Sequence, residues 1–490
     1  MKKLTILSFI LIALASAFTF RPTTEEFLVS DITEFNTALT KVKAGDAIVW
    51  KDGKYTDIKI SFNPKASGTA EKPIVFKAQT AGKVSFSGSS KIGIGGDYLQ
   101  VEGFLFEGPC TLETKENVID FKVKSVDASH CRLTNCAIVN YTHAEATEKE
   151  NYYVNIIGMN NEVDRCYFTG KTNKGPTLIV EYKQGKDYVA GSDVAPSPRH
   201  HIHHNFFGYR TFSSNGGEQM RIGTSTTSFS HGFNIIEYNY FEEERLEAEV
   251  ISNKSCDNIY RFNTFFGNDG ALVIRHGQRC FVYGNYINGK TGRNQSGGLR
   301  IINPNNTLFN NYVEELEGGH SSLKSPITVM AGLEGSALNE YYPADDAIVA
   351  YNTIVNSVGP AMKIGAGNAS KGKPFIAPKN VTIVGNLIIN TLGKTTDPVV
   401  IANPETTFQA KDNYHTNSGR YEKGFSSIKS KAITAQNGFS STPLSIDKPV
   451  MDSINQRLTV HNIKLAEKDI MQFDPKWKLT KKDVGVSWMK

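Results

Sequence analysis

The segment EYNYF at residues 237–241 is followed by RFNTF at residues 261–265 and by VYGNY at residues 282–286. Each segment is a short run of β-branched and aromatic residues with an asparagine at its turn. Such runs are typical of short strands that end at tight turns. The same pattern recurs in LTNC at 133–136, HHNFF at 203–207, FNNY at 309–312, AYNTI at 350–354 and VGNLI at 384–388.

The spacing of these asparagines predicts a solenoid. Asn239, Asn263, Asn285 and Asn311 follow one another at 24, 22 and 26 residues. Short strands at that period, with few helical stretches, are typical of stacked coils, whereas a propeller repeats at about 40 to 50 residues. Asparagine tolerates the left-handed backbone of a sharp turn, and its amide can bond to the asparagines of neighbouring coils. The longer step to Asn352 predicts a loop inserted on one face.

The two ends of the chain fit the same architecture. A weak amphipathic pattern at residues 33–42 predicts a helix that caps the N-terminal coil, because an uncapped coil exposes unpaired strand groups. The first strands are expected at 45–50, 73–76 and 84–88. Residues 403–490 are polar and rich in turns, and we expect the last coils and a covering segment there. With no linker, residues 18–490 are expected to form one all-β domain, a right-handed parallel β-helix.

The N-terminus predicts export. Lys2 and Lys3 precede an apolar run from Leu4 to Leu14, and small residues follow it at Ala15 and Ala17. This is the pattern of a signal peptide, here residues 1–17. It does not separate a periplasmic from an extracellular location. No other stretch of roughly 18 apolar residues occurs, so no membrane association is expected.

Charge and cysteines narrow the possible functions. The formal net charge is +5, which becomes +3 without Lys2 and Lys3. This balance is too mild to predict nucleic acid binding, but it suits a local basic groove that binds a polyanion. No Cys-x-x-Cys pair indicates zinc or redox chemistry. The cysteines are expected to be small buried residues, and the protein is expected to be a monomer. They are Cys110, Cys131, Cys136, Cys166, Cys256 and Cys280.

Glu247 and Glu249 are candidate metal ligands. Two residues apart on a strand, they would face the same side, where their charges repel unless a cation lies between them. Calcium prefers such oxygen ligands, and Asn215, about one coil earlier, would add a third. A glycosidase would place its two carboxylates on opposite sides of a sugar. A solvated surface pair is the alternative.

Three cations follow at coil-like spacing. Lys254, Arg275 and Arg300 are separated by 21 and 25 residues. In a parallel stack they would form a column about 10 Å tall, with about 4.8 Å between coils. Such a column matches a polymer that carries one carboxylate per sugar, whereas scattered surface cations are the alternative.

These residue types suit β-elimination on a uronate. Removal of the C5 proton builds negative charge on the sugar carboxylate, which a bound cation stabilises. A lysine among cations favours its neutral form and can accept that proton. An arginine near O4 can assist the departing sugar.

The segments at 215–223, 247–255, 274–277 and 297–301 resemble polysaccharide lyase family six, which contains the alginate lyases and chondroitinase B. The resemblance implies that calcium binds to Asn215, Glu247 and Glu249. It implies Lys254 as the base and Arg275 as the acid, and it places His276 beside them. It is closer to the alginate lyases, because Arg221 and Arg300 follow the alginate lyase pattern. Arg300 would then bind a substrate carboxylate, and Arg221 would either do the same or have a structural role.

The leading hypothesis is therefore a calcium-dependent alginate lyase. A chondroitin or dermatan sulfate lyase of the same fold is the second, and a non-catalytic carbohydrate-binding β-helix is the third. The inserted stretch 312–350, with Tyr341 and Tyr342, is expected to form one wall of the binding groove.

Overall fold

The computed structural model describes residues 24–143, 145–212, 216–290, 292, 295–321, 323–367, 372–417, 421–442 and 444–489. The predicted signal peptide at 1–17 and the predicted metal ligand Asn215 lie outside these ranges. Within the described part of the chain, no helix is long and apolar enough to cross a membrane.

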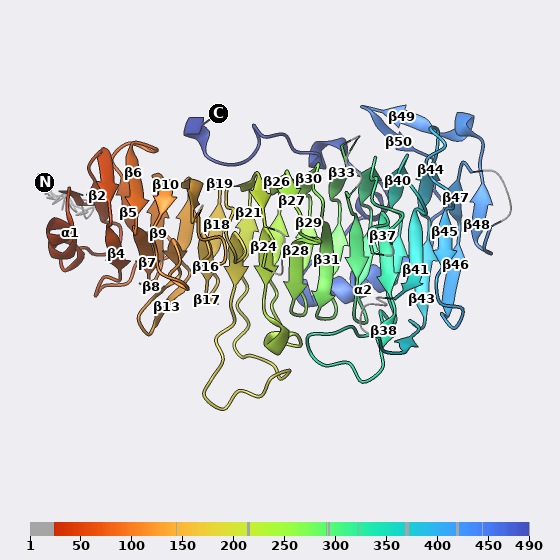
Figure 1. Cartoon of the computed structure of the whole chain (residues 1–490), viewed down its shortest axis with the longest axis horizontal. Coiled ribbons are helices and arrows are strands. Elements are labelled where there is room, and N and C mark those ends of the chain that lie inside the picture. The colour runs from red at the N-terminus through yellow and green to blue at the C-terminus, as the bar shows by residue number, and fades with distance from the viewer. Residues whose placement is uncertain are drawn as a thin grey trace, which may run out of the picture.

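Three long parallel sheets run along the molecule and form a right-handed β-helix, which confirms the predicted fold (Figure 1). Sheet A has 14 strands, from β1 (Glu26–Val29) to β46 (Phe408–Lys411), and sheet B has 14, from β3 (Gly53–Thr56) to β48 (Phe425–Ser427). Sheet C has 12 strands, which are β4 (Lys59–Phe62), β7 (Lys91–Ile94), β11 (Ile119–Asp120), β16 (Val154–Ile156), β20 (Leu178–Val180), β24 (Met220–Ile222), β28 (Glu249–Lys254), β31 (Ala271–His276), β34 (Leu299–Ile301), β37 (Ile327–Met330), β41 (Met362–Ala366) and β45 (Val399–Ile401).

Side chains of sheet C alternate between the core and the outside. Ile251, Leu272 and Leu299 stand in register on successive strands and belong to the hydrophobic core. Because neighbouring residues of a strand point to opposite faces, Ser252 and the residues aligned with it face outward. Sheet C therefore offers an outer face that runs along the stack.

The predicted asparagine ladder is present at the turns between sheets A and B. Each side-chain amide donates to the next asparagine Oδ1, for example Asn239 to Asn263 at 3.1 Å and Asn263 to Asn285 at 3.0 Å. The ladder continues without interruption through Asn205, Asn239, Asn263, Asn285, Asn311, Asn352, Asn386 and Asn413. All of its members are buried.

The predicted reason for asparagine at these turns is partly wrong. The left-handed backbone falls on the preceding residue, such as Tyr238 with φ 52° or Phe262 with φ 57°. The ladder asparagines keep ordinary φ angles, so their selection rests on hydrogen bonding. Asn135 is itself left-handed with φ 52°, and Cys136 occupies the position that corresponds to the ladder. In the next coil Cys166 donates its N–H to Asn205 Oδ1 at 2.9 Å.

The N-terminal coil carries the predicted capping helix, α1 (Ile32–Leu39). Asp31 caps it by accepting the N–H groups of Thr33 and Glu34. Phe35 points into the stack and packs edge-on against Phe76, with ring centroids 5.0 Å apart. The predicted first strands are confirmed as β2 (Ala47–Trp50), β5 (Ile74–Ala78) and β6 (Val84–Gly88).

After β48 the chain leaves the stack and runs back along it (Figure 1). The helix α2 (Lys448–Leu458) buries Met451 and Ile454 against an apolar patch on sheet A. Further on, Leu479 donates its N–H to Thr264, and Trp488 Nε1 donates to the carbonyl of Asn135. The C-terminal segment therefore spans many coils from outside. All six cysteines are buried and none forms a disulfide.

Candidate active site

Four neighbouring strands of sheet C carry most of the predicted site. β24, β28, β31 and β34 pair in this order, so residues from four coils stand side by side. Arg221 aligns with Ser252, then with Val273, then with Arg300, and all four face outward. The solenoid thus gathers residues that are far apart in sequence on one face.

The predicted straight column of Lys254, Arg275 and Arg300 is not what the register shows. A register irregularity between Asn253 and Lys254 aligns Lys254 with His276. Arg300 aligns with Val273, two residues before Arg275 along the strand. The three cations are therefore staggered across the sheet. One extra residue on β31 offsets Arg275 from Lys254, whereas Arg300 stands in the row of Ser252, two residues before Lys254.

The carboxylate of Glu249 lies between two of these cations. Its Oε1 atom is 2.9 Å from Arg300 Nη2 and 3.6 Å from Arg275 Nε. Although burial opposes ionisation, the charges of Arg300 and Arg275 hold the pKa of Glu249 below its usual value. Glu249 is therefore a carboxylate already paired with guanidinium groups.

Lys254 is a half-buried amine close to other charges. Burial and the nearby positive charge of Arg221 lower its pKa, and the carboxylates of Glu218 and Glu249 only partly oppose this shift. A lysine with a lowered pKa is more often neutral and can accept a proton. Its environment thus suits the role of base.

Glu247 has the opposite electrostatic environment. Its carboxylate accepts the N–H of Ala248 at 2.7 Å and that of Gly217 at 3.3 Å. Burial, followed by the neighbouring charge of Glu218, raises the pKa of Glu247 to about 7. Because burial and the neighbouring carboxylates both oppose ionisation of Glu247, a cation bound beside it would stabilise the ionised form. Asn215, two residues before Gly217, lies outside the described residues.

Arg221 is paired within its own strand region. Its Nη2 atom lies 2.7 Å from each oxygen of the Glu218 carboxylate. Glu218 is almost fully buried and Arg221 is partly exposed. Arg221 therefore contributes a buried ion pair beside Lys254, and its outer surface remains accessible.

His276 lies beside Lys254 and is buried. Burial, with the charges of Arg275 and Lys254, lowers the pKa of His276 to about 2. Its Nε2 atom is 3.5 Å from the hydroxyl of Ser225, in the loop after β24. The imidazole is therefore neutral at ordinary pH and can only exchange hydrogen bonds there.

Arg275 is held by the inserted loop that the spacing predicted. Its guanidinium donates to the carbonyls of Glu340 at 2.8 Å and Asn339 at 3.0 Å. It also lies over the ring of Tyr341, 4.2 Å from the centroid. The loop thus contacts a predicted catalytic residue directly.

Sequence reasoning missed Arg210. Its fully buried guanidinium donates to the carbonyls of Gly216, Gly217 and Gly175. Arg210 therefore supports the turn at Gly216 and Gly217. The N–H of Gly217 in this turn bonds to Glu247. Its partners are main-chain oxygens, which leave no residue signature in the sequence.

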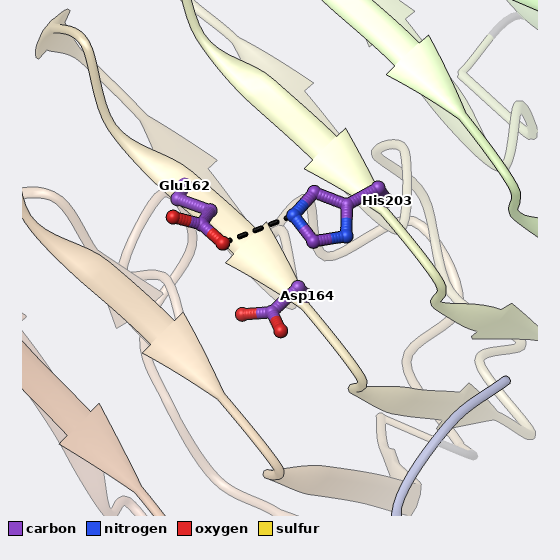
Figure 2. Close-up of side chains that lie close together, drawn as sticks. All are labelled: Glu162, Asp164 and His203. Carbon is purple, nitrogen blue, oxygen red and sulfur yellow. Dashed lines mark hydrogen bonds and ion pairs between the residues drawn. The ribbon is translucent and has the colours of Figure 1, made fainter.

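A second cluster on sheet A could hold a metal ion. Within the described ranges, Glu162, Asp164 and His203 are the one His, Cys, Asp and Glu group with ligand atoms within 4.8 Å of one another (Figure 2). Arg132 and Arg165 already pair with Asp164, at 2.7 and 2.6 Å. An ion there would compete with two guanidiniums, as an ion bound to Glu249 also would. Glu162 and Asp164 stand two residues apart on one strand. The same spacing made Glu247 and Glu249 candidate metal ligands in the sequence.

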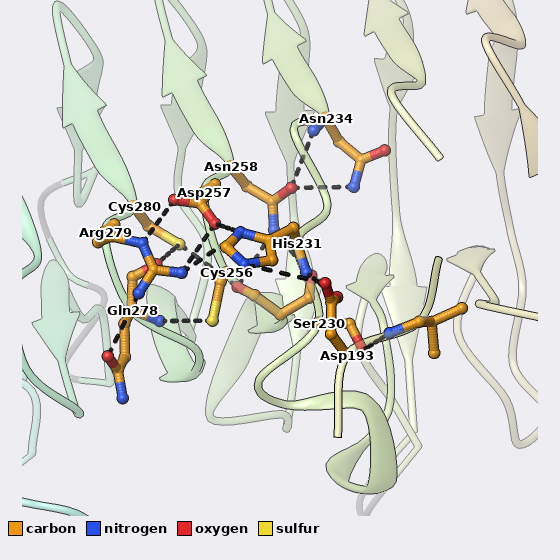
Figure 3. A network of polar contacts seen from close by, with 12 residues as sticks. Asp193, Ser230, His231, Asn234, Cys256, Asp257, Asn258, Gln278, Arg279 and Cys280 are labelled. Carbon is orange, nitrogen blue, oxygen red and sulfur yellow. Dashed lines mark hydrogen bonds and ion pairs between the residues drawn. The ribbon is translucent and has the colours of Figure 1, made fainter. Parts of the chain in front are cut away.

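A network of charged side chains connects the loops that follow several strands of sheet C. Figure 3 shows His231 between Asp257 and Asp193. His231 Nδ1 lies 2.5 Å from Asp257, whose carboxylate also accepts Arg279 Nε at 2.8 Å. The Asp193 carboxylate accepts the main-chain N–H of His231 at 2.9 Å. This bond joins the loop at 181–200 to the loop at 223–234.

A parallel β-helix with carboxylates and cations on one outer face is an architecture that polysaccharide lyases use, although the fold alone does not define the activity. The family model for chondroitinase B matches residues 29–456. The chain therefore belongs to polysaccharide lyase family six. Comparison with curated proteins gave no match.

Several solved structures are similar to the chain. A mutant form of the PL6 family alginate lyase AlyGC shares 32% identity and a TM-score of 0.79 over 94% of this chain and 58% of that one. This chain thus spans little more than half of AlyGC. A mannuronic acid specific family six lyase from human gut microbiota shares 28% identity and a TM-score of 0.72, with 95% and 97% covered. A family six lyase from Pseudopedobacter saltans shares 25% identity and a TM-score of 0.67, with 94% and 99% covered.

Proposed function

We propose that the protein is a calcium-dependent alginate lyase that cleaves mannuronate- and guluronate-containing chains by β-elimination. The observation that carries this proposal is the convergence of Lys254, Arg275, Arg300 and Glu249 on one outer face of sheet C. The similarity to alginate lyases across nearly the whole chain supports the substrate.

The residues present fit a divalent cation. Glu247 and Glu249 bring two carboxylates to one strand end, and burial, followed by the charges of Glu218 and Glu249, raises the pKa of Glu247. With Asn215 they would supply three oxygen ligands, the type that calcium prefers. Calcium held there would neutralise the substrate carboxylate while the C5 proton leaves.

The remaining chemistry belongs to the protein. Lys254, in its neutral form, accepts the C5 proton. The electrons of the C5–H bond form the C4=C5 double bond as the C4–O4 bond breaks. Arg275 faces the departing O4 oxygen and supplies a proton or hydrogen bond to it. The products are a new reducing end and an unsaturated uronate end.

A chondroitin or dermatan sulfate lyase is the second candidate. The observation that favours it is the family model itself, which describes chondroitinase B. Binding of a sulfated substrate requires cationic side chains for the sulfate groups, in addition to those that contact the sugar carboxylate. Arg221 and Arg300, already paired with glutamates, would have to serve both purposes.

The proposal is tested by incubating the protein with alginate, polymannuronate, polyguluronate and dermatan sulfate, with and without a chelator. We expect ultraviolet absorbance from the C4=C5 bond on alginate substrates, lost with chelator and restored by calcium. A rise on dermatan sulfate alone would favour the second candidate. No rise on any polymer would favour a non-catalytic binding protein.

We also propose that the protein is exported by residues 1–17 and acts as a monomer on an acidic polysaccharide, without nucleic acid or membrane partners. The basic N-terminus and apolar run support export. Expression of the full chain and N-terminal sequencing of the mature protein test the cleavage site.

A further inference from the structure

Two loops from opposite edges of sheet C meet over its outer face. One loop, described at 315–321 and 323–326, precedes β37, and the other, at 331–347, follows it. Leu323 of the first packs against a buried cluster that contains Leu333 and Tyr341 of the second. The other members of that cluster lie in or directly after the strands of sheet C and are Val273, Ile302, Met330 and Ala366.

Two lysines hold the first loop against the neighbouring coils through hydrogen bonds to main-chain carbonyls. Lys363 Nζ, on β41, donates to the carbonyls of Gly319 at 3.0 Å and Ser321 at 2.8 Å. Lys324 Nζ, in the loop itself, donates to the carbonyls of Asp269 at 3.0 Å and Gln295 at 2.8 Å. These bonds draw the loop against the coils below it.

The second loop is equally constrained. β38 (Gly332–Leu333) pairs antiparallel with β42 (Phe375–Ile376). Lys373 Nζ lies 2.5 Å from the Glu340 carboxylate, and Tyr342 packs edge-on against Phe229 with centroids 5.8 Å apart. Together with the bonds from Arg275, these contacts hold the loop in place on several sides.

The outer face under these loops is inaccessible. Val273 and Thr328 have no exposed surface, although both face outward. Arg300, predicted to bind the substrate, is only 4% exposed and pairs with Glu249, so it acts on the site through that carboxylate. The cover begins immediately beside Arg275.

The opposite direction along sheet C is built differently. There the outward residues in register with Arg221 are Ile179, Asn155 and Asp120, and Ile179 and Asn155 are themselves only 1% and 8% exposed, so the two directions differ in their loops and not in the exposure of these residues. Within the part of the chain that the structure describes, no apolar cluster joins loops from both edges over these residues. Asn155 donates to Asp120 and to Glu181, so acidic groups follow the cationic stretch on this side.

We infer that the substrate path is blocked beyond Arg275, so the enzyme binds alginate at a chain end and releases short products. The inference rests on the proposed lyase function. A polymer that must pass the Lys254 and Arg275 centre on both sides would collide with the cover formed by Leu323, Leu333 and Tyr341. A chain end meets no such obstacle.

The experiment follows viscosity and ultraviolet absorbance together during digestion of long-chain alginate by the calcium-loaded full chain. We expect absorbance and short unsaturated products from the earliest times, while viscosity falls slowly. Early loss of viscosity with a ladder of long oligosaccharides would overturn the inference and leave the lyase function intact. Absence of any absorbance would overturn the proposed function and this inference with it.

A variant pair tests the cover itself. Leu323→Ala combined with Leu333→Ala removes apolar contact between the loops without touching the predicted catalytic residues. We expect a several-fold increase in the share of longer products and faster loss of viscosity per bond cleaved. Leu392→Ala, at a side chain that is 60% exposed, is the matched control. An unchanged product pattern in a folded double variant would show that these leucines do not close the path.

Discussion

Glu249 Oε1 and Arg300 Nη2 lie 2.9 Å apart, although 51 residues separate them in the chain. Glu249 is on β28 and Arg300 is on β34, and β31 between them supplies Arg275 to the same oxygen. One carboxylate therefore links three coils. Any cation bound by Glu249 must share it with two guanidiniums.

Glu249→Gln is expected to lower the free energy of unfolding by about 3 kcal/mol, because it leaves Arg300 buried beside a neutral amide. The measurement is urea unfolding in the absence of calcium. Glu148→Gln is the control, since Glu148 and Lys174 form an exposed pair at 3.9 Å whose loss costs about 0.5 kcal/mol or less. Equal effects of the two substitutions would show that the inner pair is not stabilising.

Lys254→Ala is expected to reduce kcat by about 100-fold or more, since it removes the proposed base. Because burial and Arg221 lower the pKa of Lys254, kcat/KM should rise with pH and level off below 10.5. Circular dichroism should show an intact fold. Lys183→Ala, which removes an exposed lysine paired with Asp127, should keep the wild-type pH profile. Substantial activity in Lys254→Ala would remove this residue from the mechanism.

Calcium affinity is expected to depend on the protonation of Glu247. Its pKa of about 7 means that protons compete with the cation below neutral pH. The apparent affinity should fall by up to about tenfold per pH unit in that range. Calorimetric titration of the chelator-treated protein measures it. Glu247→Gln should bind more weakly and lose this pH dependence, and a flat profile in the wild type would exclude Glu247 as a ligand.

The raised pKa of Glu247 also predicts how the free energy of unfolding changes with pH in the absence of calcium. The folded protein keeps the Glu247 proton up to about pH 7, whereas the unfolded chain loses it near 4.5. The contribution of Glu247 to the free energy of unfolding should therefore decrease as pH rises between these values. Subtracting the unfolding profile of Glu247→Gln from that of the wild type isolates this slope. A difference that grows with pH would contradict the raised pKa.

Asn263→Ala is expected to cost about 2 kcal/mol or more, because it interrupts the ladder between Asn239 and Asn285 and leaves buried groups without partners. Chemical denaturation measures the loss. Asn36→Ala, at an exposed position of α1, should change stability by less than about 0.5 kcal/mol. Similar values for both would mean that the ladder does not stabilise the stack.

All six thiols should be unreactive in the native protein and should react once it is unfolded. They are buried, and burial raises the pKa of Cys131 to about 12 and that of Cys256 to about 11. A thiol reagent applied before and after denaturation counts them. Fewer than six reactive thiols in the unfolded, unreduced chain would reveal a disulfide.

The solenoid could be predicted because its key interaction repeats in the sequence. Each coil must satisfy the same buried turn, so Asn239, Asn263 and Asn285 recur at nearly constant spacing. The alternation of Glu247 and Glu249 and the coil-length steps to Arg275 and Arg300 likewise predicted a shared face. The left-handed residue was misplaced by one position, because a turn motif does not reveal which of its residues adopts that conformation.

Only the tertiary structure decided how these charges combine. The irregular pairing at Lys254 sets it opposite His276, because a single extra residue on β31 changes the register and nothing in the local sequence marks it. Arg275 is held by main-chain carbonyls of a loop some 64 residues later, and Arg210 by carbonyls of glycines. Every residue carries a carbonyl, so such partners have no side-chain signature. The sequence alone therefore determined the stacked coils and their charged face, while the folding of distant loops over that face determined which charges are paired and which are covered.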